Sequence, residues 1–285
     1  MTAIGRTAAR IASVRLVRTT AALLLALALL AVVGPLFSPH GAIDTGFDRI
    51  LAPPGLAGGH VFGTDNLGRD LFVRTLEGTR TTLLVATVAS IVSLLIGVVY
   101  GTIAGYVGGR VDAVMMRVVD TLYALPFIFL VILLMVAFER NFLLIFVAIG
   151  AVNWLDMARI VRGQTLALKE KEFIEAARLI GVPTRRVLLR HVAPNLLGVV
   201  LVYLTLTIPQ AVLVESFLSF LGLGIQEPAT SLGTLVANGV GVLEQAPWVL
   251  LIPSAFLFVI LLLFNFLGDG LRDAFDVRLG MEERQ

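Results

Sequence analysis

The sequence predicts an all-α integral membrane protein with six transmembrane helices, on two observations. The 285 residues are 58% hydrophobic and only 15% charged, with a mean hydropathy of +0.93, whereas soluble domains contain about 25% charged residues. The apolar residues also gather in six runs that meet or approach the roughly 20 residues that a helix needs to cross a bilayer. In chain order these runs are Val17–Phe37, Thr82–Tyr106, Thr121–Phe138, Phe142–Leu155, Leu197–Phe217 and Trp248–Leu267.

The first run follows a basic segment that contains Arg6 and Arg10, as the apolar part of a signal peptide would. The stretch "VVGPLFSPH" that comes after it lacks a convincing small-x-small cleavage site. We therefore expect an uncleaved first transmembrane helix. Each of the long runs favours insertion, at about −0.3 to −0.6 kcal/mol for every central Leu, Ile, Val or Phe.

Lysine and arginine set the expected orientation. With the N-terminus in the cytoplasm, 17 of the 22 Lys and Arg residues fall on cytoplasmic segments, which is the bias that the positive-inside rule describes. Both termini and the segment Glu172–Asn195 are then cytoplasmic, while Ser38–Arg80 and Leu218–Pro247 lie outside. The formal charge of only +2 gives no reason to expect nucleic-acid binding.

Several classes of function are disfavoured by what the sequence lacks. No ionisable residue falls in the middle of a run, and ion-coupled carriers usually need one there. The stretch "GQTLALKE" lacks the second glycine of a phosphate-binding loop. Cysteine is absent, the three histidines are scattered, and no catalytic triad or carboxylate pair is evident. We expect no catalytic residue, no metal and no cofactor bound by this chain, so any energy for transport comes from another subunit.

The cytoplasmic segment "EFIEAARLIGVPTRRVLLRHVAPN" predicts two helices joined by a turn. Phe173, Ala177 and Ile180 form one apolar stripe of a short helix. Gly181 is suited to end that helix, because glycine adopts the left-handed conformation at no steric cost. The first helix and its turn are thus expected at about residues 172–183.

The second helix is expected to begin at Pro183 and Thr184 and to end before Pro194. Together the two helices form a rigid helix–turn–helix elbow. Two interpretations stay open on this pattern alone. The elbow is either an amphipathic loop packed on the ends of its own spans, or a docking helix for a cytoplasmic partner.

The spacing of the elbow resembles a family signature. Glu175, Ala176 and Ala177 are followed after three residues by Gly181 and after nine more by "HVAP", which is similar to the EAA signature of permease subunits of ABC importers. His191 stands where that signature has Ile. The stretches "FGTDNLGRDLFVRTLEGTRTTL", "GGRVDAVMMRVVD", "ESFLSFLGLGIQEPATSLG" and "LGDGLRDAFDVRLG" resemble the C-type permease of dipeptide, oligopeptide and nickel importers.

The resemblance implies the type I ABC-importer permease fold in a bacterial inner membrane. Residues 1–81 would hold the N-terminal tail, the first transmembrane helix and an external loop, and residues 82–285 the core permease domain. The implied partners are a second permease subunit, two cytoplasmic ATPases that use ATP and Mg²⁺, and an external substrate-binding protein. The implied cargo is a di- or oligopeptide, with nickel or another small solute as the alternative within the family and an ion-coupled carrier as the alternative outside it.

The resemblance also assigns residues. The elbow would contact an ATPase through Glu172, Glu175, Ala176, Ala177, Arg178 and Gly181. Apart from the resemblance, polar residues in the apolar runs are candidates for the translocation pathway: Asn153, Gln210, Glu215 and Ser216, each of which could instead make a hydrogen bond between helices. A row of small residues at Gly97, Gly101 and Gly105 predicts close helix packing, within the chain or against the second permease.

Overall fold

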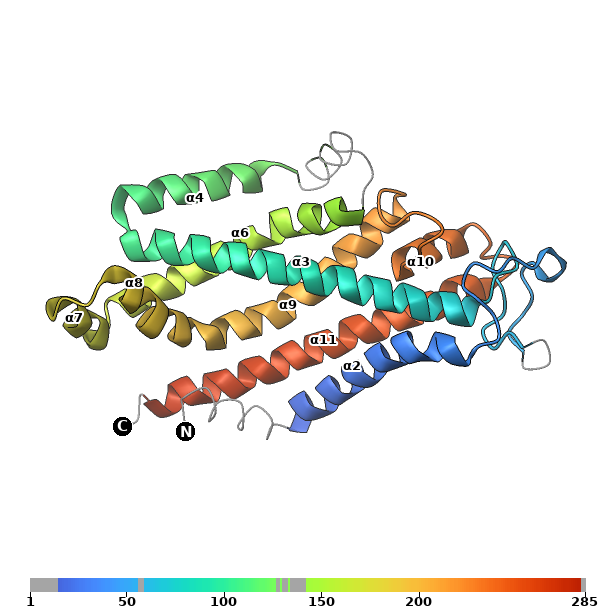
Figure 1. Cartoon of the computed structure of the whole chain (residues 1–285), viewed down its shortest axis with the longest axis horizontal. Helices are drawn as coiled ribbons and strands as arrows, with labels where there is room; N and C mark the ends of the chain where they lie inside the picture. The colour runs from blue at the N-terminus through green and yellow to red at the C-terminus, as the bar shows by residue number, and fades with distance from the viewer. Residues whose placement is uncertain (1–14, 56–58, 127–128, 130–132, 134–141, 283–285) are drawn as a thin grey trace. The chain divides into compact units, whose positions relative to one another are not determined.

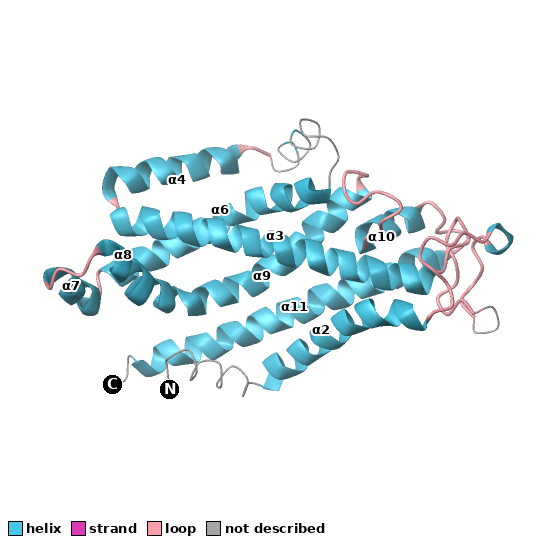
Figure 2. Ribbon diagram, viewed as in Figure 1, coloured by secondary structure: helices cyan, strands magenta, loops and turns pink. Residues whose placement is uncertain are grey.

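The computed structural model describes residues 15–55, 59–126, 129, 133 and 142–282. Over these residues the chain forms helices and loops, with only two isolated β-bridges (Figures 1 and 2). The elements are α2 (Arg15–Val33), η1 (Gly34–Phe37), η2 (Phe47–Arg49), α3 (Leu71–Val107), α4 (Gly109–Ala124), α6 (Phe142–Lys169), α7 (Glu172–Leu179), α8 (Thr184–Val187), the π-helical turn η3 (Leu188–Val192), α9 (Ala193–Phe220), α10 (Leu232–Val240) and α11 (Pro247–Glu282).

The chain divides into two compact units. One comprises Met1–Thr87 and Ile208–Ala274, and the other comprises Val88–Thr207 and Phe275–Gln285. The second unit holds the predicted elbow, and the first holds both segments that the sequence places outside. The sequence-based division at residue 81 stays a prediction.

Four helical segments in the described residues are long and apolar enough to cross a membrane: Arg15–Phe37, Leu71–Val107, Thr184–Phe220 and Pro247–Ala274. They contain the first, second, fifth and sixth predicted runs. The fourth run lies in α6, and most of the third lies outside the described residues. The all-helical membrane fold is confirmed at this level, and the number of six spans stays a prediction.

Two helices extend beyond the apolar runs that predicted them. Helix α3 begins at Leu71 rather than at Thr82, and it includes Arg74, which is 1% exposed. Helix α6 continues past Leu155 to Lys169 because its later turns still bury apolar side chains. A helix as long as α3 measures about 55 Å, well beyond the roughly 30 Å hydrocarbon layer.

The predicted start of the third span at Thr121 is wrong, because Thr121 lies inside the last turn of α4. That helix ends at Ala124, and Leu125 takes an extended conformation with φ −76° and ψ 131°. Leu125 precedes Pro126, whose ring disfavours the helical conformation for the residue before it. The proline therefore separates α4 from the apolar sequence that follows.

Candidate functional site

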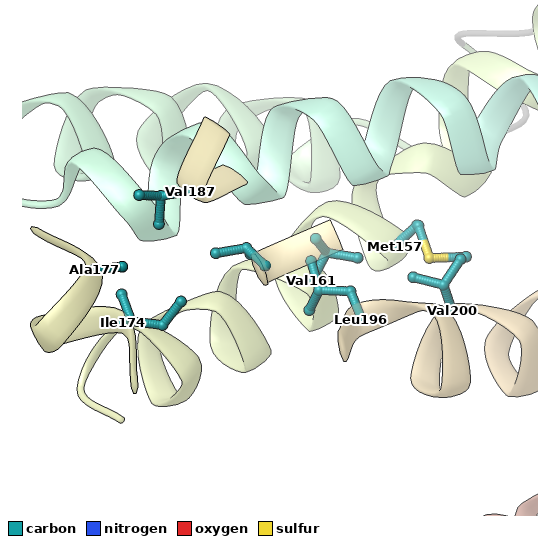
Figure 3. Close-up of a cluster of buried hydrophobic side chains, with 8 residues drawn as sticks. Met157, Val161, Ile174, Ala177, Val187, Leu196 and Val200 are labelled. Atoms are coloured by element: carbon teal, nitrogen blue, oxygen red, sulfur yellow. The ribbon is translucent and has the colours of Figure 1, made fainter. Parts of the chain in front are cut away.

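Helix α7 is fixed by its buried face. Ile174 is fully buried and Ala177 is 6% exposed. Both belong to an apolar cluster, the elbow core, made of Met157, Val161, Ile174, Ala177, Val187, Val192, Leu196 and Val200. Figure 3 shows the labelled side chains of α6, α7, α8 and α9 projecting toward one another in this cluster. Because these helices share one core, α7 is packed against both α6 and the helix that begins at Thr184.

The predicted apolar stripe of α7 is wrong in two of its three members. Phe173 is 45% exposed and Ile180 is 80% exposed, and only Ala177 faces inward. The buried pair is Ile174 and Ala177, spaced i and i+3. Ala177 satisfies both patterns, so the sequence alone could not decide which side of so short a helix meets α6.

Gly181 ends α7 as predicted. Its φ is +80°, in the left-handed region where a side chain is strained. The amide of Gly181 donates to the carbonyl oxygen of Arg178 at 3.0 Å, and that of Val182 donates to the carbonyl oxygen of Ala177 at 3.0 Å. These two bonds define a Schellman motif. Val182 also packs against the elbow core, so the turn is held by hydrogen bonds and by apolar contact.

The second helix begins after Pro183, as predicted, with Thr184 as its first residue. Its predicted end before Pro194 is wrong, since the helix continues into α9. The π-helical turn η3 precedes the proline, and the amide of Ala193 donates to the carbonyl oxygen of Leu188, five residues back. Such a turn shifts the backbone pairing, and the side-chain amide of Asn195 donates to the carbonyl oxygen of His191 at 2.6 Å.

The outer surface of α7 combines two carboxylates with apolar side chains. Glu172, Glu175 and Ala176 are exposed, and Leu179 and Ile180 are 82% and 80% exposed at the C-terminal end. The acidic residues lie in the first turn, where the helix dipole favours negative charge. Large apolar side chains exposed this fully next to charged residues are typical of a surface that another protein covers.

Arg178, the last of the predicted coupling residues, contacts its own chain. Its Nε donates to the hydroxyl oxygen of Tyr106 at 3.2 Å. Its guanidinium carbon also lies 4.6 Å from the centroid of the Tyr106 ring, within the range of a cation–π interaction. Arg178 thus ties α7 to the end of α3, in addition to the elbow core.

A bidentate ion pair joins α4 to α6 in the same unit. Arg162 donates from Nε to Asp112 Oδ1 at 2.5 Å and from Nη2 to Asp112 Oδ2 at 2.6 Å. The hydrogen bonds from Arg162 hold the pKa of Asp112 below its ordinary value, although burial acts in the opposite direction. A second pair links Arg159 to Asp120 at 2.9 Å. Helix α6 is therefore fixed on one side by charge and on the other by the elbow core.

Comparisons with known proteins assign the family. Residues 97–281 match the family described as binding-protein-dependent transport system inner membrane component. The chain belongs to this family. The matched residues include all of α4, α6, α7, α9 and α10.

Individual relatives of this transport component cover most of the chain. The oligopeptide transport system permease protein OppC of Haemophilus influenzae is 53% identical over 244 residues, which are 86% of this chain and 78% of the relative. The dipeptide transport system permease protein DppC of Bacillus subtilis is 45% identical over 258 residues, 90% of this chain and 80% of the relative. An inward-facing structure of the MetNI methionine ABC transporter shares the fold, with a TM-score of 0.58 and 19% identity over 70% of this chain and 96% of the solved chain.

The predicted row of glycines in this transport component lies against α6 of the same chain. A Cβ atom at Gly97 would lie 2.5 Å from Met157 Cβ, and one at Gly101 would lie 2.4 Å from the carbonyl oxygen of Ala158. At Gly105 the nearest atom, the carbonyl oxygen of Arg162, would be 2.7 Å away. All these distances are shorter than real side-chain contacts, so only glycine permits this approach of α3 to α6.

The four predicted pathway residues have different surroundings. Glu215 is fully buried and accepts hydrogen bonds from Thr82 at 3.1 Å and Ser219 at 2.7 Å. Ser216 is 7% exposed beside it, whereas Gln210 is exposed. Asn153 lies in the other unit, and its buried Nδ2 has no hydrogen-bond partner among the described residues. The structure thus brings Glu215 and Ser216 together in a polar cluster inside the chain.

Sequence reasoning missed an ion-pair network in the segments expected outside. Arg69 donates to Asp65 Oδ2 at 2.7 Å and to Glu227 Oε2 at 2.7 Å, and Arg74 donates to Glu227 Oε1 at 3.0 Å. The i, i+4 spacing of Asp65 and Arg69 gives little signal in the sequence, because these residues lie in a turn and not in a helix. The network joins the two segments to each other through ion pairs.

Proposed function

We propose that the chain is a non-catalytic transmembrane permease subunit of an ATP-driven importer of di- or oligopeptides. It contributes half of the translocation pathway and spans a bacterial cell membrane six times, with both termini in the cytoplasm. Relatives that are named as oligopeptide and dipeptide permeases, similar over most of the chain, support the peptide cargo. The partners are a second permease subunit, two cytoplasmic ATPases and an external substrate-binding protein.

The observation that carries the proposal is the two-sided construction of α7. One side is locked to α6 and α8 by the buried pair Ile174 and Ala177. The other side exposes Glu175, Leu179 and Ile180. A helix that is fixed to membrane-spanning helices and exposes an apolar, acidic surface is suited to receive force from a partner.

In the proposed mechanism, α7 lies in a groove of one ATPase. Glu172 and Glu175 accept hydrogen bonds or ion pairs there, and Leu179 and Ile180 enter an apolar part of the groove. ATP-driven closure of the ATPase pair pushes α7. Because the elbow core and the Schellman motif keep the turn rigid, the push moves α6 and the helix from Thr184 as rigid bodies, and the pathway opens on the opposite side. ATP and Mg²⁺ are bound by the ATPases.

Reconstitution tests the energy source. Proteoliposomes that contain both permeases and both ATPases, with the binding protein outside and ATP inside, are expected to accumulate a labelled peptide. Omission of ATP abolishes accumulation, and collapse of the proton and sodium gradients leaves it unchanged. Accumulation that follows an ion gradient, or that occurs without the ATPases, would overturn the proposal. Competition with free Ni²⁺ and with a mixed set of peptides identifies the cargo.

Charge reversal tests the coupling surface. Glu175→Lys is expected to lower uptake by about tenfold or more, because each 1.4 kcal/mol of lost docking free energy is a tenfold change in affinity. The spans stay folded, since Glu175 is exposed. Glu244→Lys is the matched control, an exposed glutamate between α10 and α11, and it leaves uptake unchanged. Full uptake by the Glu175→Lys importer would contradict the role of α7.

A further inference from the structure

Two histidines and an aspartate that are distant in the sequence meet in the first unit. His40 follows η1, His60 pairs with Gly55 in a short β-bridge, and Asp70 immediately precedes α3. The rings of His40 and His60 stack with their centroids 4.3 Å apart at an angle of 22°. The histidines are scattered in the sequence, and their spacing predicts no metal site. For His40 and His60 the scattering holds in sequence but not in space.

Asp70 and His60 form the fixed part of this cluster. Asp70 is 2% exposed and His60 is 6% exposed. His60 Nδ1 lies 2.8 Å from Asp70 Oδ2, and Asp70 Oδ1 accepts the backbone amide of Val73 at 2.9 Å as the N-cap of α3. The helix therefore orients the carboxylate, and the carboxylate orients the imidazole, so two of the three ligand side chains are held in place before any ion binds.

His40 provides a ring nitrogen that makes no hydrogen bond within the described residues. Its Nε2 atom is buried and has no hydrogen-bond partner there. Buried polar atoms without a partner are uncommon, and an absent ion is one of their explanations. Gly59, at φ +74°, leaves room beside this nitrogen, because a Cβ at that position would lie 3.2 Å from His40 Nε2. A donor atom is thus kept free next to an anchored His–Asp pair.

We propose that His40, His60 and Asp70 bind a divalent transition-metal ion of the zinc class. One nitrogen of each histidine and one carboxylate oxygen of Asp70 lie within 4.8 Å of one another. Zinc binds nitrogen and oxygen at about 2.0–2.2 Å, so its tetrahedral ligands lie about 3.3 Å apart. The His40 ring, which is only half-buried, would have to move its nitrogen to that distance, and a water molecule would complete the fourth position. Two imidazoles disfavour Mg²⁺ and Ca²⁺, which prefer oxygen ligands.

Binding requires a change at Arg49. The ion replaces the hydrogen between His60 Nδ1 and Asp70 Oδ2, and the ring retains one proton, now on Nε2. Arg49 Nη1 lies 3.4 Å from this Nε2, and two donors do not share a hydrogen bond. Arg49 is 51% exposed and turns toward solvent or Asp48, 3.5 Å from its Nε. Removal of the positively charged Arg49 side chain is therefore expected to strengthen metal binding.

A bound ion would cross-link three points of the segment between η1 and α3. It would fix the residue after η1, the bridge at His60 and the first turn of α3 to one another. This inference concerns the segment itself and does not depend on the cargo or on the ATPases. If no metal bound, the proposed peptide transport would still stand, and if no peptide were taken up, the metal site could still be measured.

The experiment uses the purified importer complex in detergent, stripped of metal with EDTA. Equilibrium dialysis against Zn²⁺ gives the number of ions bound, and visible absorption of Co²⁺ reports tetrahedral coordination. His40→Ala removes a ligand but no hydrogen bond of the described residues, and Asp70→Asn keeps the N-cap. His191→Ala is the matched control, the third histidine of the chain. Thermal unfolding without metal shows that each variant is folded.

The wild-type complex is expected to bind one ion more per permease than the His40→Ala complex and to show the tetrahedral Co²⁺ bands. His40→Ala and Asp70→Asn lower the affinity by at least about tenfold, Arg49→Ala raises it, and His191→Ala leaves it unchanged. Equal stoichiometry and affinity in the wild type and in a folded His40→Ala complex would overturn the proposal. The proposal would also be overturned if His191→Ala lowered the metal affinity as much as His40→Ala does.

Discussion

The backbone amide of Val182 donates to the carbonyl oxygen of Ala177 at 3.0 Å. This bond closes the turn between α7 and the helix that begins at Thr184. Ala177 also belongs to the elbow core, and Val182 packs against it. The turn is therefore held both by this hydrogen bond and by apolar packing. A turn held in this way transmits a displacement of α7 instead of absorbing it, and the first prediction tests that rigidity.

Gly181→Ala is expected to loosen this turn. The φ of +80° costs a non-glycine residue about 1–2 kcal/mol, and no atom lies within 4 Å of the added Cβ, so the effect is backbone strain alone. Hydrogen exchange of the Gly181 and Val182 amides becomes faster, and less peptide is transported per ATP hydrolysed. Gly163→Ala is the control, since its Cβ also meets nothing within 4 Å and its φ is not positive. Equal exchange in both variants would exclude strain at Gly181.

Substitution of two isoleucines of the elbow is expected to affect two different properties, the stability of the fold and the docking of the ATPases. Ile174→Ala, at a fully buried position, is expected to destabilise the second unit by about 2–5 kcal/mol through transfer and cavity terms. Ile180→Ala, at a position that is 80% exposed, leaves the unfolding midpoint unchanged but weakens the affinity for the ATPases. Thermal unfolding of the permease and pull-down of the ATPases measure the two effects. Weakened stability with normal docking in Ile180→Ala would mean that no partner covers this surface.

The sequence predicted only part of the elbow, because some of its features are set by local backbone conformation and others by contacts between helices. Gly181 and Pro183 act through their own backbone conformation, so their roles could be predicted locally. The burial of Ile174 rather than Phe173 depends on how α7 meets α6, which involves residues distant in the sequence. Pro194 misled the prediction because a π-helical turn, invisible in the residue pattern, accommodates it.

The segments expected outside show the same limit. Hydropathy excluded Arg74 from the second span, yet the fold buries it, paired with Glu227 from a distant segment. His40 and His60 stack although 19 residues separate them. In both cases the partner is chosen by tertiary contacts, so no window of local sequence contains the information.

Close packing of α3 on α6 gives a third prediction. Gly101→Ala places a Cβ 2.4 Å from the carbonyl oxygen of Ala158, a backbone atom that cannot rotate away. We expect a loss of stability of about 1–3 kcal/mol from overpacking, seen as a lower unfolding midpoint. Gly241→Ala is the matched control, because its nearest neighbour is the carbonyl oxygen of Asn238 at an ordinary 3.6 Å. A destabilisation equal to that of the control would contradict the close approach of the two helices.

The fourth prediction concerns acid stability and the Glu227 carboxylate. Burial acts to raise its pKa from the ordinary value of 4.5, but the hydrogen bond from Arg69 and the charge of Arg74 outweigh burial and lower the pKa. A lowered folded-state pKa stabilises the fold above pH 4.5, and this contribution is lost as the pH falls through the folded-state value. Because the carboxylate is 53% exposed, solvent screening limits the contribution to about 1 kcal/mol.

Glu227→Gln is therefore expected to unfold at a lower temperature than the wild type at pH 7, and this difference is expected to shrink as the pH is lowered from 7 to below 4.5. The matched variant Glu244→Gln, at an exposed glutamate outside the network, shows no such dependence. Unfolding midpoints measured across this pH range check the sign directly. A gap between wild type and Glu227→Gln that widens as the pH falls would require a raised pKa, and it would contradict the pairing of Glu227 with Arg69 and Arg74.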